Sequence, residues 1–213
     1  MIFMKTNFEL KYEPGFSIVE IVVTIFAFTV LAWGVLMLFS GIFTSSSQQG
    51  TLLAGADSAR KLSFQFSQEL RGAAVASNGA YVLEKADEQE IIFYSPNADA
   101  DTGVERIRYF VNGDELFKGV VEYNGSDYDD STEKSYSVQK NLANGSRPVF
   151  YYYDGDYVGS STQIALLQPV SVTQVKYVKL NLEIFNKAGV ENDNYYNVST
   201  GVAVRNIKTN LGD

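Results

Sequence analysis

One single carboxylate and one cluster of carboxylates in this sequence have residue types and spacing that could do chemistry. The first is Glu20 alone, which stands at the start of an apolar run; the next charged residue along the chain is Asp57. The second is the acidic segment from Asp127 to Glu133, which holds four carboxylates in seven positions. A charge in lipid costs several kcal/mol, and clustered carboxylates suit hard cations. We therefore consider an ionic contact at Glu20 and a cation site in the acidic segment.

The acidic segment matches only part of a calcium-binding pattern. Its carboxylates are Asp127, Asp129, Asp130 and Glu133. An EF-hand loop is excluded because Thr132 stands at the sixth position counted from Asp127, where glycine is needed, and Val138 at the twelfth, where glutamate is needed. The segment is either an irregular Ca²⁺ loop with these four ligands or a solvated acidic turn. The acidic stretches 97–103 and 154–156 are interpreted as a hairpin loop and a tight turn.

The remaining composition excludes most enzyme classes. The chain contains neither Cys nor His, which removes thiol chemistry, imidazole bases and the commonest zinc ligands. The sequence also lacks a G-x-S-x-G elbow, a phosphate-binding loop and a dinucleotide fingerprint. A net charge of −8 argues against direct contact with nucleic acid. We expect a protein that is not an enzyme and has no cofactor other than the possible Ca²⁺.

The element that must position Glu20 is the apolar run that follows it. Residues 21–39 are uncharged and are interrupted only by Thr24, Thr29 and Gly34. Their number is close to the ~20 residues with which a helix crosses a bilayer. The run is also longer than the apolar core of a usual secretory signal. The sequence therefore predicts a single transmembrane helix.

Flanking cations indicate the orientation of this helix. Lys5 and Lys11 precede the span, and no Lys or Arg follows it until Arg60. The positive-inside rule places the N-terminus in the cytoplasm and the remainder of the chain on the other side of the membrane. We therefore expect a single-pass protein of the cytoplasmic membrane with an extracytoplasmic head.

The six residues that end at Glu20 carry a family resemblance. The hexapeptide GFSIVE, residues 15–20, lies behind a short polar leader and opens the apolar run. In this position it resembles the cleavage and methylation signature of type IV prepilins and pseudopilins. The resemblance implies that prepilin peptidase cuts between Gly15 and Phe16 on the cytoplasmic side. It also implies N-methylation of Phe16, so that residues 16–213 would form the mature chain.

The same resemblance implies a role for Glu20 in assembly. Helices of this family pack side by side in a filament core, where the Glu20 carboxylate would neutralise the Phe16 amine of the neighbouring subunit and fix the axial register. The alternative is a Glu20 that reaches the headgroups at the membrane face. The implied partners are other pilin or pseudopilin subunits, prepilin peptidase, the inner-membrane assembly platform and, before assembly, membrane lipid.

The resemblance and the hydrophobic pattern divide the chain into four parts. They are a leader (1–15), a transmembrane or filament-core helix (16–43), the outer half of a stalk helix (44–78) and a head domain (79–213). In the outer half, an apolar stripe recurs at spacings of three and four and predicts a face that covers a sheet. The stripe consists of Ala59, Leu62, Phe66, Leu70 and Ala73, and the charged residues off it are Arg60, Lys61, Glu69 and Arg71.

Glycines suggest where this stalk helix weakens and ends. Gly41, Gly50 and Gly55 each lower helix propensity by up to ~1 kcal/mol, so we expect a bend or local melting around Ser45 to Gly55. The tripeptide Ser77-Asn78-Gly79 is expected to end the helix with a glycine cap.

The head is expected to consist of strands. Apolar or alternating segments predict them at 90–95, 105–111, 115–121, 148–153, 175–184 and 196–204, with a hairpin turn at 112–114. Serial strands after one helix predict an α+β fold with antiparallel pairing. In 178–184 the apolar positions should face the core, and Lys179, Asn181 and Glu183 should face solvent. Residues 56–210 resemble, more loosely, the J-type pseudopilin of type II secretion and the W-type minor pilin of type IV pili.

The tyrosines of 151–153 and Tyr157 could form a binding face, and the alternative is half-buried packing on the sheet. For the whole chain we expect a structural function. The sequence resembles a minor pilin or pseudopilin of a type IV pilus or type II secretion filament, assembled at the filament tip. The competing expectation is a signal-anchored extracytoplasmic protein that binds a ligand or adheres without polymerising.

Overall fold

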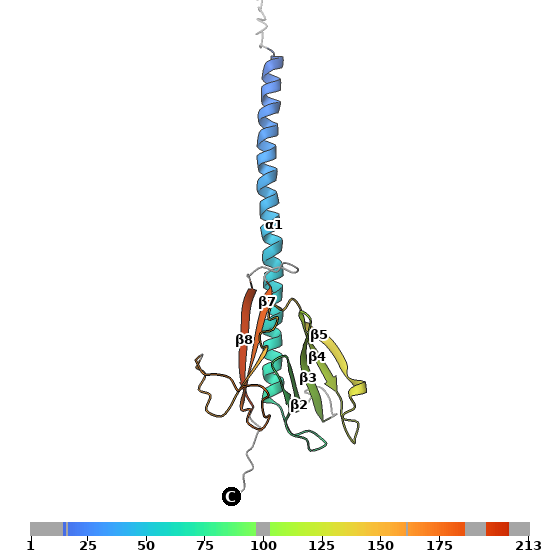
Figure 1. Ribbon diagram of the computed structural model, residues 1–213. Coiled ribbons are helices and arrows are strands. Elements are labelled where there is room, and N and C mark those ends of the chain that lie inside the picture. Colours follow the sequence, from blue (N-terminus) through green and yellow to red (C-terminus); the bar gives the residue numbers. More distant parts are fainter. Residues whose placement is uncertain (1–14, 16, 97–102, 161, 186–194, 205–213) are drawn as a thin grey trace, which may run out of the picture. The chain divides into compact units, whose positions relative to one another are not determined.

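The computed structural model describes residues 15, 17–96, 103–160, 162–185 and 195–204, and for residues 41–54 it describes the helix but not the side chains. Within this described part the protein has one long helix, α1 (Ile18–Arg71), and eight strands in two antiparallel sheets. Residues up to Gln48 and residues from Gln49 onward form two compact units. The fold is α+β, as the sequence predicts (Figure 1).

The helix α1 continues through the segment that the glycines mark as weak. Residues from Ser45 to Gly55 are helical, so the expected local melting is wrong. Each interior glycine costs about 1 kcal/mol relative to alanine. A break would lose several backbone hydrogen bonds and would require a second nucleation, which is unfavourable. The cooperative helix therefore tolerates its glycines.

The helix ends at Arg71, earlier than expected, because the first sheet takes over its hydrogen bonding. The Ser95 hydroxyl donates to the Glu69 carbonyl (2.8 Å), one of the carbonyls left over in the last turn of the helix. The Ala74 amide donates to the Tyr94 carbonyl (2.9 Å), so the chain already runs beside the sheet at this point.

Gly79 closes a turn rather than the helix, so the expected glycine cap at 77–79 is wrong. Its amide donates to the Ala76 carbonyl (2.9 Å), and its φ of +87° is a conformation that only glycine adopts readily. Gly79 does mark a turn, but this turn lies in the connection between the helix and the first strand.

The first sheet is an antiparallel meander of five strands in chain order. They are β1 (Leu83–Ala86), β2 (Glu90–Pro96), β3 (Val104–Asn112), β4 (Glu115–Val121) and β5 (Lys134–Gln139). The two edge strands, β1 and β5, were not expected, because both are short and neither has a run of large apolar residues. The hairpin between β3 and β4 is confirmed: Asn112 pairs with Glu115, and Gly113 has the positive φ (+64°) of a two-residue turn.

The second sheet has three antiparallel strands. They are β6 (Phe150–Tyr153), β7 (Tyr177–Phe185) and β8 (Tyr195–Ala203), in the order β6-β7-β8. These strands confirm the last three strand segments expected from the sequence. Figure 1 shows β2 to β5 on one side of the C-terminal half of α1 and β7 and β8 on the other side. The outer half of α1 is therefore covered by two sheets rather than one.

The apolar stripe of α1 is the centre of the core, as the sequence predicts. All five stripe residues, Ala59, Leu62, Phe66, Leu70 and Ala73, are buried. Phe66 joins both sheets: its ring lies 5.4 Å from Tyr109 and 6.2 Å from Phe93 in the first sheet, and 5.9 Å from Phe150 in the second. One side chain thus connects the three layers of the head.

A second face of α1 carries small residues where it meets β8. Gly55, Ala59, Ser63 and Ser67 recur every four residues and so lie on one face. A Cβ on Gly55 would lie 2.6 Å from the Tyr196 hydroxyl, and the Ser67 and Thr200 hydroxyls are hydrogen-bonded at 3.1 Å. Small side chains let β8 approach the helix closely on this face.

β7 departs from the expected alternation. Val178, Leu180, Leu182 and Ile184 are buried as predicted, but Asn181 and Glu183 on the opposite face are buried as well. Asn144 covers them, because its Nδ2 donates to the Asn181 carbonyl (3.0 Å) and its Oδ1 accepts from the Glu183 amide (2.9 Å). Alternation reports which residues face the core, but not whether a loop covers the other face.

Candidate functional site

The N-terminal part of α1 is long and apolar enough to span a membrane. The segment Ile18–Ser40 has 23 residues and a mean hydropathy of 2.5. At 1.5 Å per residue it measures about 35 Å, which exceeds the ~30 Å hydrocarbon core of a bilayer. The protein thus has an N-terminal helix with the dimensions of a single-pass anchor.

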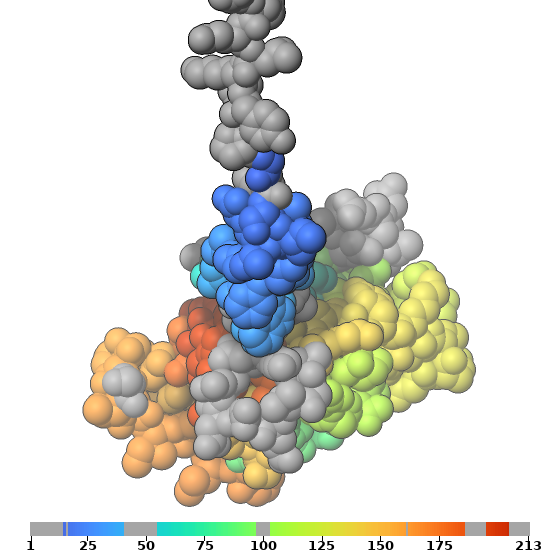
Figure 2. Space-filling model, turned by 90° about the horizontal axis from the view of Figure 1, so that it is seen from above, coloured from blue at the N-terminus to red at the C-terminus, as the bar shows by residue number. Residues whose placement is uncertain are grey.

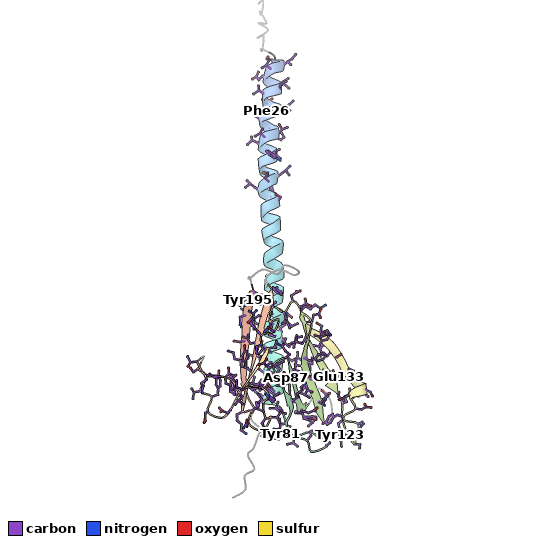
Figure 3. The ribbon with its side chains drawn as sticks, in the orientation of Figure 1. Phe26, Tyr81, Asp87, Tyr123, Glu133 and Tyr195 are labelled. Carbon is purple, nitrogen blue, oxygen red and sulfur yellow. The ribbon has the colours of Figure 1, made fainter. Side chains whose placement is uncertain are left out.

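This span is apolar on every face rather than along one stripe. None of its side chains is buried within the chain, and large apolar side chains project all around it (Figure 3). Its hydroxyl groups are satisfied locally: Thr24 donates to the Ile21 carbonyl and Thr29 to the Phe26 carbonyl, both at 2.8 Å. A helix of this kind needs an apolar environment on all sides, which only lipid or other apolar helices supply.

The residues of the predicted processing and assembly site lie at the start of this span. Gly15 is exposed, and a Cβ placed on it would meet no atom within 4 Å; Phe16 lies outside the described residues. The helix begins just beyond, where the Ser17 carbonyl accepts from the Glu20 amide (3.0 Å). Gly15 is therefore exposed three residues before the start of the helix.

Glu20 occupies the first helical turn and is exposed. A carboxylate is favoured there by the partial positive charge at a helix N-terminus, which contributes about 0.3–1 kcal/mol at exposed sites. Among the described residues no cationic side chain forms an ion pair with it. Both interpretations of Glu20, pairing with another subunit and reaching the headgroups, are compatible with this position at the very end of the span.

The sequence analysis missed a buried ionic network in the head. Glu69, expected off the packed face of α1, accepts a hydrogen bond from the Tyr109 hydroxyl (2.7 Å) and pairs with Lys118 Nζ (2.6 Å). Gln65 donates to the same carboxylate at 2.8 Å. Burial, and then the negative charge of Glu69, raise the pKa of Tyr109 well above its usual value. The only indication of this network in the sequence was a lysine, Lys118, at an inward-facing position of the strand β4.

A cavity of about 570 Å³ lies beside this network, between α1 and the inner face of β3 to β5. Its lining mixes amides, charges and apolar groups, including Gln68, Glu105, Ile107, Val120 and Tyr136. Lys118 and Glu69 also line the cavity, and they are paired with each other.

The first two carboxylates of the acidic segment organise their own loop. Asp127 accepts from the Tyr128 amide (2.9 Å) and from Asn78 Nδ2 (2.8 Å), and these hydrogen bonds lower its pKa. Asp129 accepts from the hydroxyl and amide of Ser131, which lowers its pKa and caps a short 3₁₀ helix. Hydrogen bonds of this kind stabilise a turn without any metal.

The last two carboxylates of the segment pair with arginines of β3. Asp130 lies 3.0 Å from Arg106 Nη1, and Glu133 lies 3.4 Å from Arg108 Nη1. Glu133 reaches Arg108 across the bare backbone of Gly119, where a Cβ would collide with the Glu133 carboxylate. In the part of the chain that the structure describes, no group of three or more acidic side chains is placed to hold a metal ion. Calcium binding stays a prediction that this geometry does not favour.

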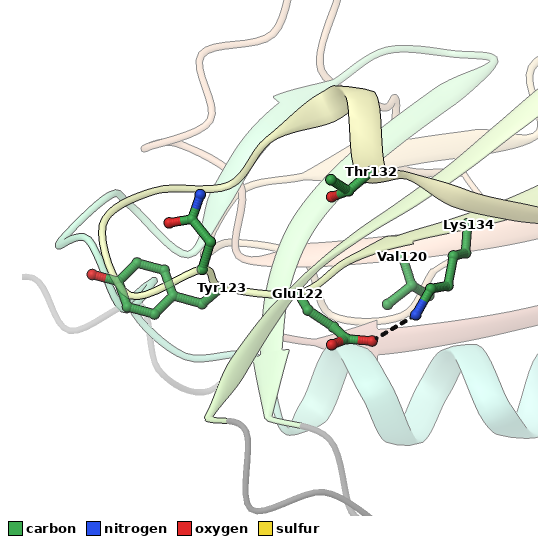
Figure 4. Close-up of a pocket in the computed structure, with 6 residues that line it drawn as sticks. Val120, Glu122, Tyr123, Thr132 and Lys134 are labelled. Atoms are coloured by element: carbon green, nitrogen blue, oxygen red, sulfur yellow. Dashed lines mark hydrogen bonds and ion pairs between the residues drawn. The ribbon is translucent and has the colours of Figure 1, made fainter.

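A shallow cavity of about 240 Å³ opens beside the acidic segment (Figure 4). Its lining residues include Val120, Tyr123 and Thr132, and Glu122 is paired with Lys134 at 2.9 Å across it. Glu122 and Lys134 pair with each other in an exposed position, so neither presents an unpaired charge to a ligand in the cavity.

The tyrosines of β6 mostly pack within the head. Tyr152 is fully buried and Tyr151 is half-buried. Tyr153 stacks on Tyr157 with ring centroids 4.1 Å apart, and Tyr157 lies 4.5 Å from Tyr177. Each of these rings packs against a neighbouring ring, which favours packing on the sheet over a free binding face.

Comparison with known proteins does not add a family. The chain matches no protein-family model. A search of curated proteins finds no significant match. The resemblance therefore rests on residues 15–20, on the span behind them and on the α+β arrangement of the head.

Proposed function

We propose that this protein is a minor pilin or pseudopilin, a structural subunit of a type IV pilus or type II secretion filament. The observation that carries the proposal is the junction at residues 15–20. There an exposed Gly15 lies three residues before the start of a helix that has Glu20 in its first turn and apolar side chains on every face beyond it.

The exposed apolar faces of the span are consistent with a subunit that assembles with others. Lipid can cover such a helix before assembly, and the helices of neighbouring subunits can replace that lipid afterwards, because both surround it with apolar groups. An anchor that only holds a domain at the membrane also needs an apolar span, but it does not need a carboxylate at the third position of the helix.

The position of Glu20 supports a contact between subunits. A carboxylate surrounded by apolar helices requires a cation, and the described part of this chain supplies none. Cleavage after Gly15 would create an amine on Phe16, four residues before Glu20. On a neighbouring subunit shifted along the filament axis, that amine is a suitable partner.

The head supports a structural role rather than a catalytic one. Several of its charged side chains form ion pairs within the protein, and the chain has neither His nor Cys to serve as a base or nucleophile. Its work in this proposal is to contact other proteins, after prepilin peptidase and an inner-membrane assembly platform have acted on the N-terminal part.

The test compares Glu20→Gln with a matched control, Val19→Leu, in cells that assemble the filament. Glu20→Gln removes the charge and keeps the shape, so the variant should still insert into the membrane. Its incorporation into sheared filaments should fall about tenfold or more, equivalent to about 1.4 kcal/mol of lost pairing. Val19→Leu should assemble normally. Normal incorporation of Glu20→Gln would remove Glu20 from the assembly mechanism, and absence of the parent chain from the filaments would favour the anchored, non-polymerising alternative.

A further inference from the structure

The strand β8 forms a long edge of the second sheet. It has nine residues and pairs with β7 alone, in the sheet order β6-β7-β8. The backbone N–H and C=O groups on the other side of an edge strand have no strand partner. Such an edge is a template on which another extended chain can pair.

The hydrogen bonds of β7 show which residues of β8 direct their backbone outward. The Asn181 amide donates to the Val149 carbonyl (2.8 Å) on the β6 side, so odd-numbered residues of β7 face β6 and even-numbered residues face β8. Because β7 and β8 pair even with even, as in Leu180 with Thr200, the even-numbered residues of β8 face β7. The outward backbone groups therefore belong to Tyr195, Asn197, Ser199, Gly201 and Ala203. In the part of the chain that the structure describes, no hydrogen bond reaches them on that side.

The other three sheet edges are covered or interrupted. On β6 the Phe150 amide donates to the Glu88 carbonyl (3.0 Å), and the Tyr152 carbonyl accepts from the Leu166 amide (2.8 Å). β1 has four residues and β5 has six, and the pairing of each shifts its register once. Short strands, bulges and charges keep edges from pairing. β8 has none of these features, since it is long, pairs without a shift and contains neither a charged residue nor a proline.

An exposed face of α1 lies next to this edge. Arg60, Phe64 and Arg71 are spaced four and seven residues apart, so they share one face of the helix, and Phe64 is 65% exposed. Around the helix, Ser67 lies between this face and the buried Phe66, and Ser67 is hydrogen-bonded to β8. Figures 1 and 2 show β8 and β5 on opposite sides of the head, so the first sheet does not cover the edge of β8. A strand added to β8 would therefore lie over the exposed face.

Tyr177 indicates that Arg71 lies close to β8. Tyr177 pairs with Ala203, and its hydroxyl lies over Gly201, where a Cβ would collide with it. Burial and the neighbouring Tyr157 raise the pKa of Tyr177, and the positive charge of Arg71 opposes this rise. The Arg71 guanidinium is therefore near the end of β8, close to its last outward backbone groups.

The charges on this face indicate which kind of segment fits it. Among the described residues neither Arg60 nor Arg71 forms an ion pair, although the chain has a net charge of −8. Asp57, one turn before Arg60, is paired with Lys61 (3.1 Å). Along α1 the two arginines are about 16 Å apart, the length of roughly four to six strand residues. Two carboxylates at that spacing on an extended segment would meet both arginines, and an apolar residue between them would cover Phe64.

A second copy of β8 does not supply these groups. β8 contains no carboxylate, so an antiparallel pair of β8 strands would leave both arginines without partners. We propose that β8 and the adjacent face of α1 bind an extended acidic segment of another protein, which adds to the second sheet as a fourth strand. In this mode of recognition the backbone supplies affinity and alternate side chains supply specificity. The inference goes beyond the proposed function and does not depend on cleavage at Gly15.

The test uses the full-length protein in detergent and a synthetic probe. The probe is a fluorescent peptide of about ten residues, threonine alternating with valine, with two aspartates about four residues apart on one face and a valine midway between them. Its fluorescence anisotropy should rise on binding. The same peptide with lysines in place of the aspartates, or with alternate amides N-methylated, should bind at least about tenfold more weakly. No binding of the acidic peptide, or equal binding of the lysine peptide, would overturn the proposal.

Variants of the protein test the two halves of the site separately. Ser199→Pro removes one outward N–H and no hydrogen bond to β7, so the head should unfold at about the same temperature while peptide binding falls about tenfold. Ser199→Ala keeps the N–H and should bind like the parent. Arg71→Glu should also weaken binding about tenfold, and Lys140→Glu, the same charge change at an exposed lysine, should not.

Undiminished binding by Ser199→Pro or by Arg71→Glu would contradict the proposal. Light scattering of the detergent-solubilised chains tests the other occupant. A parent that is a dimer, together with a Ser199→Pro chain that is a monomer, would assign the edge to a second copy and overturn the choice of an acidic partner. None of these results depends on the mass of the mature N-terminus.

Discussion

The two parts of α1 place the same residue types in opposite environments. Phe26, in the span, is 70% exposed, whereas Phe66 is 0% exposed and contacts both sheets. The two glutamates of the helix differ in the same way. Glu20 lacks a cationic partner among the described residues, and Glu69 is held by Lys118, Tyr109 and Gln65.

This difference separates what the chain does alone from what it needs others for. The head is held mainly by its own contacts, since it has a buried apolar core and several ion pairs inside one compact unit. The span meets none of its requirements from within the described chain. Changes in the head should therefore affect folding, and changes in the span should affect insertion and assembly.

The largest expected difference compares Phe66→Ala with Phe26→Ala in the full chain in detergent. Phe66→Ala leaves a cavity where the two sheets meet α1 and should lower the free energy of unfolding of the head by about 3–5 kcal/mol. Phe26→Ala should change it by less than about 0.5 kcal/mol. Urea unfolding followed by near-UV circular dichroism of the tyrosines measures both. Equal losses would mean that the span is part of the head's core.

A smaller effect is expected when the Glu69 network loses its cation. Lys118→Met leaves a mostly buried carboxylate facing Tyr109, and should destabilise the head by about 3 kcal/mol. Adding Glu69→Gln removes the charge and should restore part of that loss. Glu20→Gln is the matched change in the span and should leave the unfolding of the head unchanged. If Lys118→Met alone were neutral, the network would not support the fold.

The smallest expected effect is on the stability of the head at acidic pH. The hydrogen bonds that the Arg106 side chain donates lower the pKa of Glu84 below its ordinary value of 4.5; burial opposes this shift, and the Tyr94 hydroxyl adds to it. A lowered folded-state pKa gives stability that is present above pH 4.5 and is lost as the pH falls through the folded-state pKa.

Glu84→Gln should therefore reduce the loss of head stability on acidification below pH 4.5, by less than about 1 kcal/mol because Glu84 is partly exposed. Thermal unfolding between pH 7 and pH 3 checks this. Glu122→Gln, at an exposed ion pair, is the control and should leave the acid dependence unchanged. A Glu84→Gln chain that loses as much stability in acid as the parent would assign the acid sensitivity to other carboxylates.

Periodicity predicted the packed stripe and most strands, because burial on one face of an element leaves a direct imprint on its sequence. The end of α1 could not be predicted, since Ser95 and Tyr94 satisfy the helix end from a distant strand. The edge strands β1 and β5 are short, with few large apolar residues, and are held by pairing with their neighbours β2 and β4. The burial of Asn181 depends on Asn144, which is far away along the chain.

For the candidate site, the sequence predicted the span, and the structure places Glu20 in its first turn. The acidic segment was harder to interpret, because carboxylates of a metal loop and carboxylates of a hydrogen-bonded turn have the same sequence pattern. Only the positions of Arg106 and Arg108 show how two of these carboxylates are used. The exposure of Val158, Ile164 and Leu167 was missed because an apolar residue in a loop gives no sign of which way it points.

The most direct test of this account is the intact mass of the protein purified from its native membrane. Cleavage by prepilin peptidase predicts a chain that begins at Phe16, lacks residues 1–15 and carries one added methyl group. A mature chain that still begins at Met1 would contradict the proposal that this protein is a pilin-like subunit.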